Sequence, residues 1–152
     1  MLKQIVALVV SLVIAYIPGA IGNLVSPGQW YDDLDKPPFQ PPGAVFPSVW
    51  IPLYLVMGVS LYLIWRSSAS NKQPAYVLFG IQAVLNAAWS LVFFGMQLPW
   101  VAAVIIVSLL AVVVYSINCF RSISKWAAWL FVPYAAWVAF ATYLNLGVAI
   151  LN

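Results

Sequence analysis

The side chains that could do chemistry in this sequence are aromatic rings and neutral amides. Histidine is absent and Cys119 is the single cysteine, which argues against most metal sites, a histidine-ligated haem and a Ser-His-Asp or Cys-His nucleophile. The sequence also has no glycine-rich phosphate loop, so ATP-driven pumping by this chain alone is not expected. The interactions that remain available for binding are stacking on aromatic rings and hydrogen bonding from neutral donors. Both suit a large, flat, apolar ligand.

Three apolar segments each gather such residues on one helical face, because each residue of a helix advances by about 100°. Two interpretations stay open. The polar groups bond other helices inside a packed bundle, or some of them are left as donors for a ligand in a cavity. The three faces comprise Pro47, Trp50, Tyr54, Met57, Leu61 and Trp65; Gln82, Asn86, Trp89 and Phe93; and Tyr134, Trp137, Ala141 and Asn145.

The composition requires lipid as the solvent. Of 152 residues, 65% are hydrophobic and only 6% are charged, whereas soluble domains carry about 25% charged residues. A transmembrane helix needs about 20 apolar residues, and five stretches of that length lack any acidic or basic residue. They run approximately over 5–24, 44–65, 75–97, 100–120 and 126–150. The sequence therefore predicts an all-α integral membrane protein, a single domain over residues 1–152 built as a bundle of five transmembrane helices.

The charges predict the orientation of this bundle. Five of the six basic residues fall in connections on the side of the N-terminus, and Lys36 alone falls on the other side. The positive-inside rule then places the N-terminus in the cytoplasm and the C-terminus and the 30–42 loop opposite. Because no ionisable group lies inside a span, an ion-coupled pump is disfavoured. The first span has an alternative interpretation as a signal peptide, although its apolar run continues to Val25 and favours a span kinked at Pro18.

The connection WYDDLDKPPFQPP, residues 30–42, is the most distinctive part of the sequence. Four prolines among six residues predict a stiff, extended backbone from Lys36 to Pro42. One interpretation is a rigid interfacial loop with aromatic anchors, and the other is a lid whose Trp30, Tyr31 and Phe39 close a cavity between helices. Lys36 or an indole N–H would then meet a carboxylate at the edge of the ligand.

Small residues mark the opposite face of the third span. Gly80, Ala83 and Ala87 recur there, a pattern suited to close contact with another helix. Tryptophans near the ends of spans are expected to anchor the protein at the membrane interface. These are Trp65, Trp100, Trp126 and Trp129.

Four ordered blocks together resemble the tryptophan-rich sensory protein (TspO) family, whose mammalian relatives are the mitochondrial translocator proteins. They are WYDDLDKPPFQPP from Trp30, FPSVWIPLYLVMG from Phe46, QAVLNAAWSLVFFG from Gln82 and VPYAAWVAFATYLN from Val132. The resemblance implies a five-helix bundle, usually a homodimer, with a pocket beneath the first long loop. Family members bind tetrapyrroles such as protoporphyrin IX and benzodiazepine-type ligands.

Carried over by position, the resemblance implies that Trp50 and Trp137 donate to a ligand with Asn86 beside them. Tyr143 is followed by no Lys or Arg, so the carboxy-terminal cholesterol motif of mammalian members is missing. The chain looks more like a bacterial member, and cholesterol is not predicted as its ligand. The predicted ligand-binding residues are Trp30, Tyr31, Pro42, Trp50, Tyr54, Asn86, Trp89, Phe93, Trp137 and Ala141, and the predicted dimer contact is Gly80, Ala83 and Ala87.

Three functions fit this resemblance. The first is a membrane receptor or sensor for tetrapyrroles, and the second is a light-dependent enzyme that oxidises bound porphyrin with the help of Trp30 and Trp137. The third is a carrier of tetrapyrroles or lipid. Each needs protoporphyrin IX or a similar molecule as ligand or substrate, and none requires an obligatory cofactor, a metal ion or nucleic acid. The expected partners are membrane lipid, a tetrapyrrole and a second copy of the chain.

Overall fold

The computed structural model describes residues 1–25 and 27–152. Within these residues, five helices are long and apolar enough to span a membrane. The predicted fold class is therefore confirmed, and each helix lies within a few residues of its predicted stretch. The spans are α1 (Leu2–Gly22), α3 (Val45–Arg66), α4 (Gln73–Ser90) continued by the π-helical turn η1 (Leu91–Gly95), α5 (Pro99–Ile123) and α6 (Lys125–Leu151).

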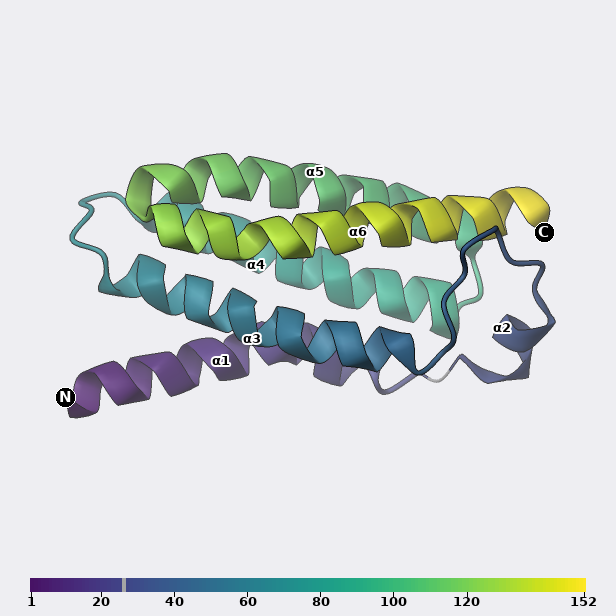
Figure 1. Ribbon diagram of the computed structural model, residues 1–152, viewed down its shortest axis with the longest axis horizontal. Coiled ribbons are helices and arrows are strands. Elements are labelled where there is room, and N and C mark those ends of the chain that lie inside the picture. Colours follow the sequence, from purple (N-terminus) through teal and green to yellow (C-terminus); the bar gives the residue numbers. More distant parts are fainter. Residues whose placement is uncertain (26) are drawn as a thin grey trace.

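The five long helices lie along the long axis of the molecule (Figure 1), and their contacts close a ring. Helix α1 packs on α3, α3 on α6, α6 on α5, α5 on α4, and α4 returns to α1. The N-terminus lies at one end of the ring. The C-terminus and the short helix α2 (Gly28–Asp33) lie at the other end, together with the proline-rich part of the 30–42 loop.

The helix ends follow from local sequence. Proline occupies the first turn of α4 and of α5, where its missing N–H would have had no partner in the helix. Ser124 is the one residue between α5 and α6, and its Oγ accepts a hydrogen bond from the N–H of Ala127 at 3.3 Å. This cap begins α6 directly after α5 and makes the two helices antiparallel neighbours.

The core lies where α3, α4, α5 and α6 meet. Phe120 and Phe131 are fully buried, with ring centroids 4.8 Å apart, and Tyr134 packs edge-on against Phe131. The outer faces of the helices are equally apolar, as a lipid solvent permits. The four tryptophans predicted to be interfacial all point outward, with exposed fractions of 44% to 74%.

The 30–42 loop differs from the prediction in two respects. Its first residues form α2, which the sequence did not predict, and only the segment after Asp33 is irregular. Phe39 has a left-handed φ of 65° and is 86% exposed. The hypothesis that Phe39 closes a cavity is therefore wrong, because the turn directs its ring away from the bundle.

Candidate ligand-binding site

A cavity of about 340 Å³ lies beneath the loop end of the bundle, between α1, α3 and the junction of α4 with η1. We call it the loop cavity. Its volume lies in the range of about 300 to 1,000 Å³ that is typical of small-molecule sites. Its main lining residues are Tyr16, Gly19 and Gly22 of α1, Tyr31 of α2, Phe46, Trp50, Ile51 and Tyr54 of α3, and Trp89, Ser90 and Phe94 of α4 and η1.

Aromatic rings in mutual contact form the α3 wall. The rings of Trp50 and Tyr54 stack with centroids 5.4 Å apart and planes 22° apart. Tyr16 meets the Tyr54 ring edge-on from α1 at 5.7 Å, and Trp137 meets Trp50 edge-on from α6 at 6.3 Å. Such contacts hold each ring in place, so the cavity offers flat apolar faces that are already oriented.

Two glycines let α1 pack closely against α3 and α4 and so form a further wall of the cavity. A Cβ on Gly19 would lie 2.5 Å from a ring carbon of Tyr54, and a Cβ on Gly22 would lie 3.0 Å from Oγ of Ser90. This contribution of α1 to the cavity was not predicted from the sequence. The signal was present, because Tyr16, Gly19 and Gly22 recur at intervals of three residues and therefore share one side of α1.

Behind the Tyr54 wall, a chain of hydrogen bonds crosses the buried interior. The hydroxyl of Tyr54 donates to Oδ1 of Asn86 at 3.1 Å, and Nδ2 of Asn86 donates to the hydroxyl of Tyr134 at 3.0 Å. Tyr134 donates in turn to Oε1 of Gln82 at 2.8 Å. Both polar atoms of the Asn86 side chain therefore have protein partners, and this amide supports the wall of the cavity.

Trp89 and Trp137 differ in what their indole N–H groups contact. Trp89 donates to Oδ1 of Asn145 at 2.9 Å, and Asn145 donates to the carbonyl of Pro99, so Trp89 presents only its ring to the cavity. The N–H of Trp137 is buried and has no hydrogen-bond partner among the described residues. A buried donor without a partner costs free energy. Trp137 lies behind Trp50 and does not line the cavity, so a ligand would reach this donor only if the rings in front of it moved.

Tyr31 covers the cavity from the loop side. Its hydroxyl accepts a hydrogen bond from Nε2 of Gln40 at 2.7 Å. Burial raises the pKa of Tyr31, with a smaller contribution in the same direction from the charge of Asp32 and an opposing one from Gln40. Nζ of Lys36 lies 4.9 Å from the centre of the Tyr31 ring and donates to the carbonyls of Asp32 and Leu34. Lys36 thus stabilises the loop itself.

The loop is also attached to the end of α6. Pro37 packs against Gly147, where an added Cβ would lie 2.5 Å from Cβ of the proline. The hydroxyl of Tyr143 donates to the carbonyl of Pro38 at 2.9 Å. The side chain of Asn152 pairs with the backbone of Asp35, accepting from its N–H and donating to its carbonyl, both at 3.0 Å. These contacts attach the 30–42 loop to the C-terminal end of α6.

The other predicted ligand-binding residues lie around the cavity. Trp30 packs edge-on against the buried ring of Phe93, with centroids 5.8 Å apart. Phe93 and Ala141 line a separate space of only about 20 Å³. Pro42 is exposed, and its carbonyl accepts a hydrogen bond from the N–H of Val45. The structure thus places Tyr31, Trp50, Tyr54 and Trp89 on the cavity wall, and Asn86, Trp137, Trp30, Phe93, Ala141 and Pro42 outside it.

The small residues of α4 have different environments. Gly80 is exposed, and an added Cβ there would meet nothing within 4 Å. Ala83 is half-buried, and Ala87 is buried within the subunit. Only the Gly80 end of the predicted dimer contact is therefore open to another helix.

Comparison with known proteins gives consistent matches along the chain. The TspO/MBR family model matches residues 6–151. The Tryptophan-rich protein TspO of Chlorobaculum tepidum is 39% identical over 157 residues, covering 99% of this chain and 98% of the relative. A protein of the same name from Archaeoglobus fulgidus is 34% identical, covering 99% and 97%. The Translocator protein of Ovis aries is 38% identical over 121 residues, covering 77% and 71%.

Proposed function

The chain belongs to the TspO/MBR family of membrane proteins, and from this premise we propose that it is a membrane receptor for flat tetrapyrroles. Protoporphyrin IX is the expected ligand, and benzodiazepine-type molecules would occupy the same place. The observation that carries the proposal is the loop cavity, whose walls are stacked aromatic rings and which has the volume of a small-molecule site. The ligand would lie against the Trp50–Tyr54 face, with its edge under the loop.

The polar groups around the cavity support this assignment. Burial of apolar area and stacking on such a wall favour a flat ligand. The N–H of Trp137, which has no partner among the described residues, lies behind Trp50 and would donate to a ligand that displaces that ring. The chain contains no histidine, so axial coordination of iron by imidazole plays no part, and the free-base porphyrin is the expected form. A clear preference for haem over protoporphyrin IX would contradict this point.

Occupancy would be signalled through the lid. Tyr31 lines the cavity, and the loop that follows it is fixed to α6 at Gly147, Tyr143 and Asn152. A ligand that displaces Tyr31 would shift this loop relative to α6. The signal would then be a movement of the 30–42 loop at the surface of the molecule, where a partner could detect it.

Light-dependent oxidation of the bound porphyrin is a second candidate. Tyr54, Trp50 and Trp137 form a continuous series of oxidisable rings that starts at the cavity wall. Trp30 is less well placed, because its ring packs on Phe93 instead. If this candidate holds, illumination in the presence of oxygen will bleach bound protoporphyrin IX, a Trp137→Phe variant will bleach it more slowly, and samples kept dark will not change.

The binding proposal is tested by filling the cavity. Ser90 lines it, whereas Ser108 lies on the exposed face of α5, so Ser90→Trp and Ser108→Trp form a matched pair. The purified variants are titrated with protoporphyrin IX and the Soret band is recorded. We expect saturable binding of one ligand per chain, weakened by roughly tenfold or more in Ser90→Trp, which corresponds to about 1.4 kcal/mol, and unchanged in Ser108→Trp. Equal affinity in both variants would place the ligand elsewhere.

A further inference from the structure

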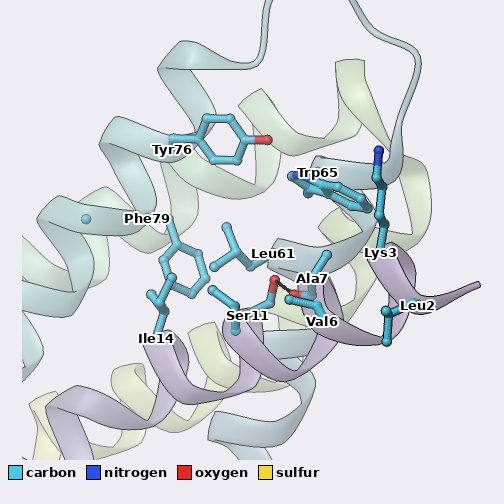
Figure 2. Close-up of a pocket in the computed structure, with 12 residues that line it drawn as sticks. Leu2, Lys3, Val6, Ala7, Ser11, Ile14, Leu61, Trp65, Tyr76 and Phe79 are labelled. Carbon is cyan, nitrogen blue, oxygen red and sulfur yellow. Dashed lines mark hydrogen bonds between the residues drawn. The ribbon is translucent and has the colours of Figure 1, made fainter.

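A second and larger cavity lies at the opposite end of α1, among residues that play no part in the loop cavity. Its volume is about 650 Å³, and it lies between the first half of α1, the end of α3 and the start of α4 (Figure 2). We call it the α1/α4 groove. Val6, Val10 and Ile14 of α1 face Leu61 of α3 and Phe79 of α4 across it.

The body of the α1/α4 groove is apolar and open. Its one hydroxyl in the middle, that of Ser11, donates to the carbonyl of Ala7 at 2.8 Å, as the dashed line in Figure 2 shows. This internal bond leaves no free donor on that wall. Gly80 lines the groove, and an added Cβ there would meet no atom within 4 Å. Such a surface fits a hydrocarbon chain, which needs close contact and no hydrogen bonds.

One end of the groove is polar and basic. Figure 2 shows Lys3 running beside Trp65, with the hydroxyl of Tyr76 directed toward the same indole. Nζ of Lys72 donates to the carbonyl of Trp65 at 2.7 Å, and Arg66 ends α3 directly after Trp65. Tryptophan and tyrosine at such a position are typical of the membrane interface. Of these cations, Lys3 lines the groove itself, while Lys72 and Arg66 lie beside it at Trp65. The groove therefore has apolar walls at depth and cations at and beside the end where lipid headgroups lie.

No acidic side chain balances these cations. The only acids of the chain, Asp32, Asp33 and Asp35, lie in and just after α2, at the other end of the bundle. We propose that the α1/α4 groove binds an anionic phospholipid, with an acyl chain between α1 and α4 and the phosphate at Lys3, Lys72 and Arg66. Basic residues at this depth attract anionic headgroups, and the same charges would repel one another across a symmetric contact with a second copy.

The test uses native mass spectrometry of the full chain in detergent, equilibrated with equal amounts of phosphatidylglycerol and phosphatidylcholine. The variant Lys3→Gln/Lys72→Gln removes two cations from the rim. Arg121→Gln/Lys125→Gln is the matched control, because it removes the same charge from a separate groove between α5 and α6. A third variant, Gly80→Leu, fills the floor of the α1/α4 groove without changing the charge.

We expect the wild type to carry phosphatidylglycerol in at least about fivefold excess over phosphatidylcholine, the size of effect that one basic residue near an anionic lipid surface produces. The excess will disappear in Lys3→Gln/Lys72→Gln and persist in Arg121→Gln/Lys125→Gln. Gly80→Leu will lower the bound phosphatidylglycerol and leave the proportion of dimer unchanged. Equal enrichment in the two double variants would overturn the proposal. A loss of dimer in Gly80→Leu with bound lipid unchanged would also overturn it and would assign the groove to a second copy.

Discussion

The hydroxyl of Tyr54 donates to Oδ1 of Asn86 over 3.1 Å, while the ring of the same tyrosine forms the wall of the loop cavity. One side chain thus belongs both to the candidate binding surface and to the buried hydrogen-bond chain that continues through Tyr134 to Gln82. A ligand that moves the Tyr54 ring must disturb this chain. The cavity wall is therefore only as rigid as the network behind it.

Tyr134→Phe tests the contribution of this network to stability. The substitution leaves Nδ2 of Asn86 without its acceptor and Oε1 of Gln82 without its donor. Hydrogen bonds between membrane helices contribute about 0.6 kcal/mol on average and at most about 1.7 kcal/mol. We expect the free energy of unfolding to fall by about 1 kcal/mol, measured by titrating detergent-folded protein with sodium dodecyl sulfate. Tyr115→Phe, at a position 65% exposed, is the control, and equal stability of the two variants would show that the network is unimportant.

Gly147→Ala tests whether α6 holds the lid. The added methyl would lie 2.5 Å from Cβ of Pro37, so the loop must move away from α6. We expect amide hydrogen exchange at Asp35, whose N–H donates to Asn152, to accelerate by roughly tenfold, which corresponds to about 1.4 kcal/mol. Gly43→Ala is the control, because a Cβ there meets nothing within 4 Å. Unchanged exchange at Asp35 would show that Pro37 and Gly147 do not position the loop.

Gly19→Ala tests the approach of α1 to the cavity. The methyl would lie 2.5 Å from the Tyr54 ring, and that ring is held by Trp50 and by Asn86. We expect the affinity for protoporphyrin IX to fall by roughly tenfold, or about 1.4 kcal/mol. Gly80→Ala makes the same change on a helix where the space is open and should bind as the wild type does. If both variants bind equally well, the ligand does not contact this part of α1.

The lid should respond to alkaline pH. The pKa of Tyr31 is raised above 10.0, chiefly by burial, so the closed lid favours the neutral phenol over the phenolate. The stabilisation of the closed loop by the neutral phenol is fully present below pH 10. It is lost as the pH rises through the raised pKa of Tyr31. Protoporphyrin IX affinity, measured from about pH 8 to about pH 11, should fall at the alkaline end. The fall should be smaller in Tyr31→Phe, and an identical pH profile in that variant would exclude Tyr31 as its cause.

The long helices were predictable because a membrane span requires a continuous stretch of about 20 apolar residues, which can be read from local sequence alone. Each predicted span coincides with a helix to within a few residues. The helix α2 was missed because the pattern around Asp32 and Asp33 is short and polar, and so carries no apolar period. The π-helical turn at Leu91–Gly95, closed by a bond from the N–H of Met96 to the carbonyl of Leu91, likewise has no signature in the spacing of apolar residues.

The candidate site was predictable only in part. Helical spacing placed Trp50, Tyr54 and Trp89 on inward faces, and all three line the cavity. The spacing of residues along one helix could not identify hydrogen-bond partners on another helix. It therefore did not show that Asn86 bonds two tyrosines or that Trp89 bonds Asn145. These pairings join residues far apart in the chain and depend on how the helices pack. The α1 wall was missed for the same reason, since glycines become informative only when the neighbouring helix is known.

A tetrapyrrole bound in the loop cavity would lie against Trp50, with Trp137 directly behind that ring. We would test this by a tryptophan-fluorescence titration of the purified protein with protoporphyrin IX, comparing wild type with Trp50→Phe, Trp137→Phe and the outward-facing control Trp100→Phe, whose tryptophan is 60% exposed. We expect saturable quenching that is weakened in the first two variants and retained in the third. Quenching that fails to saturate, or that is the same in all three variants, would contradict it and would mean that these rings serve packing alone.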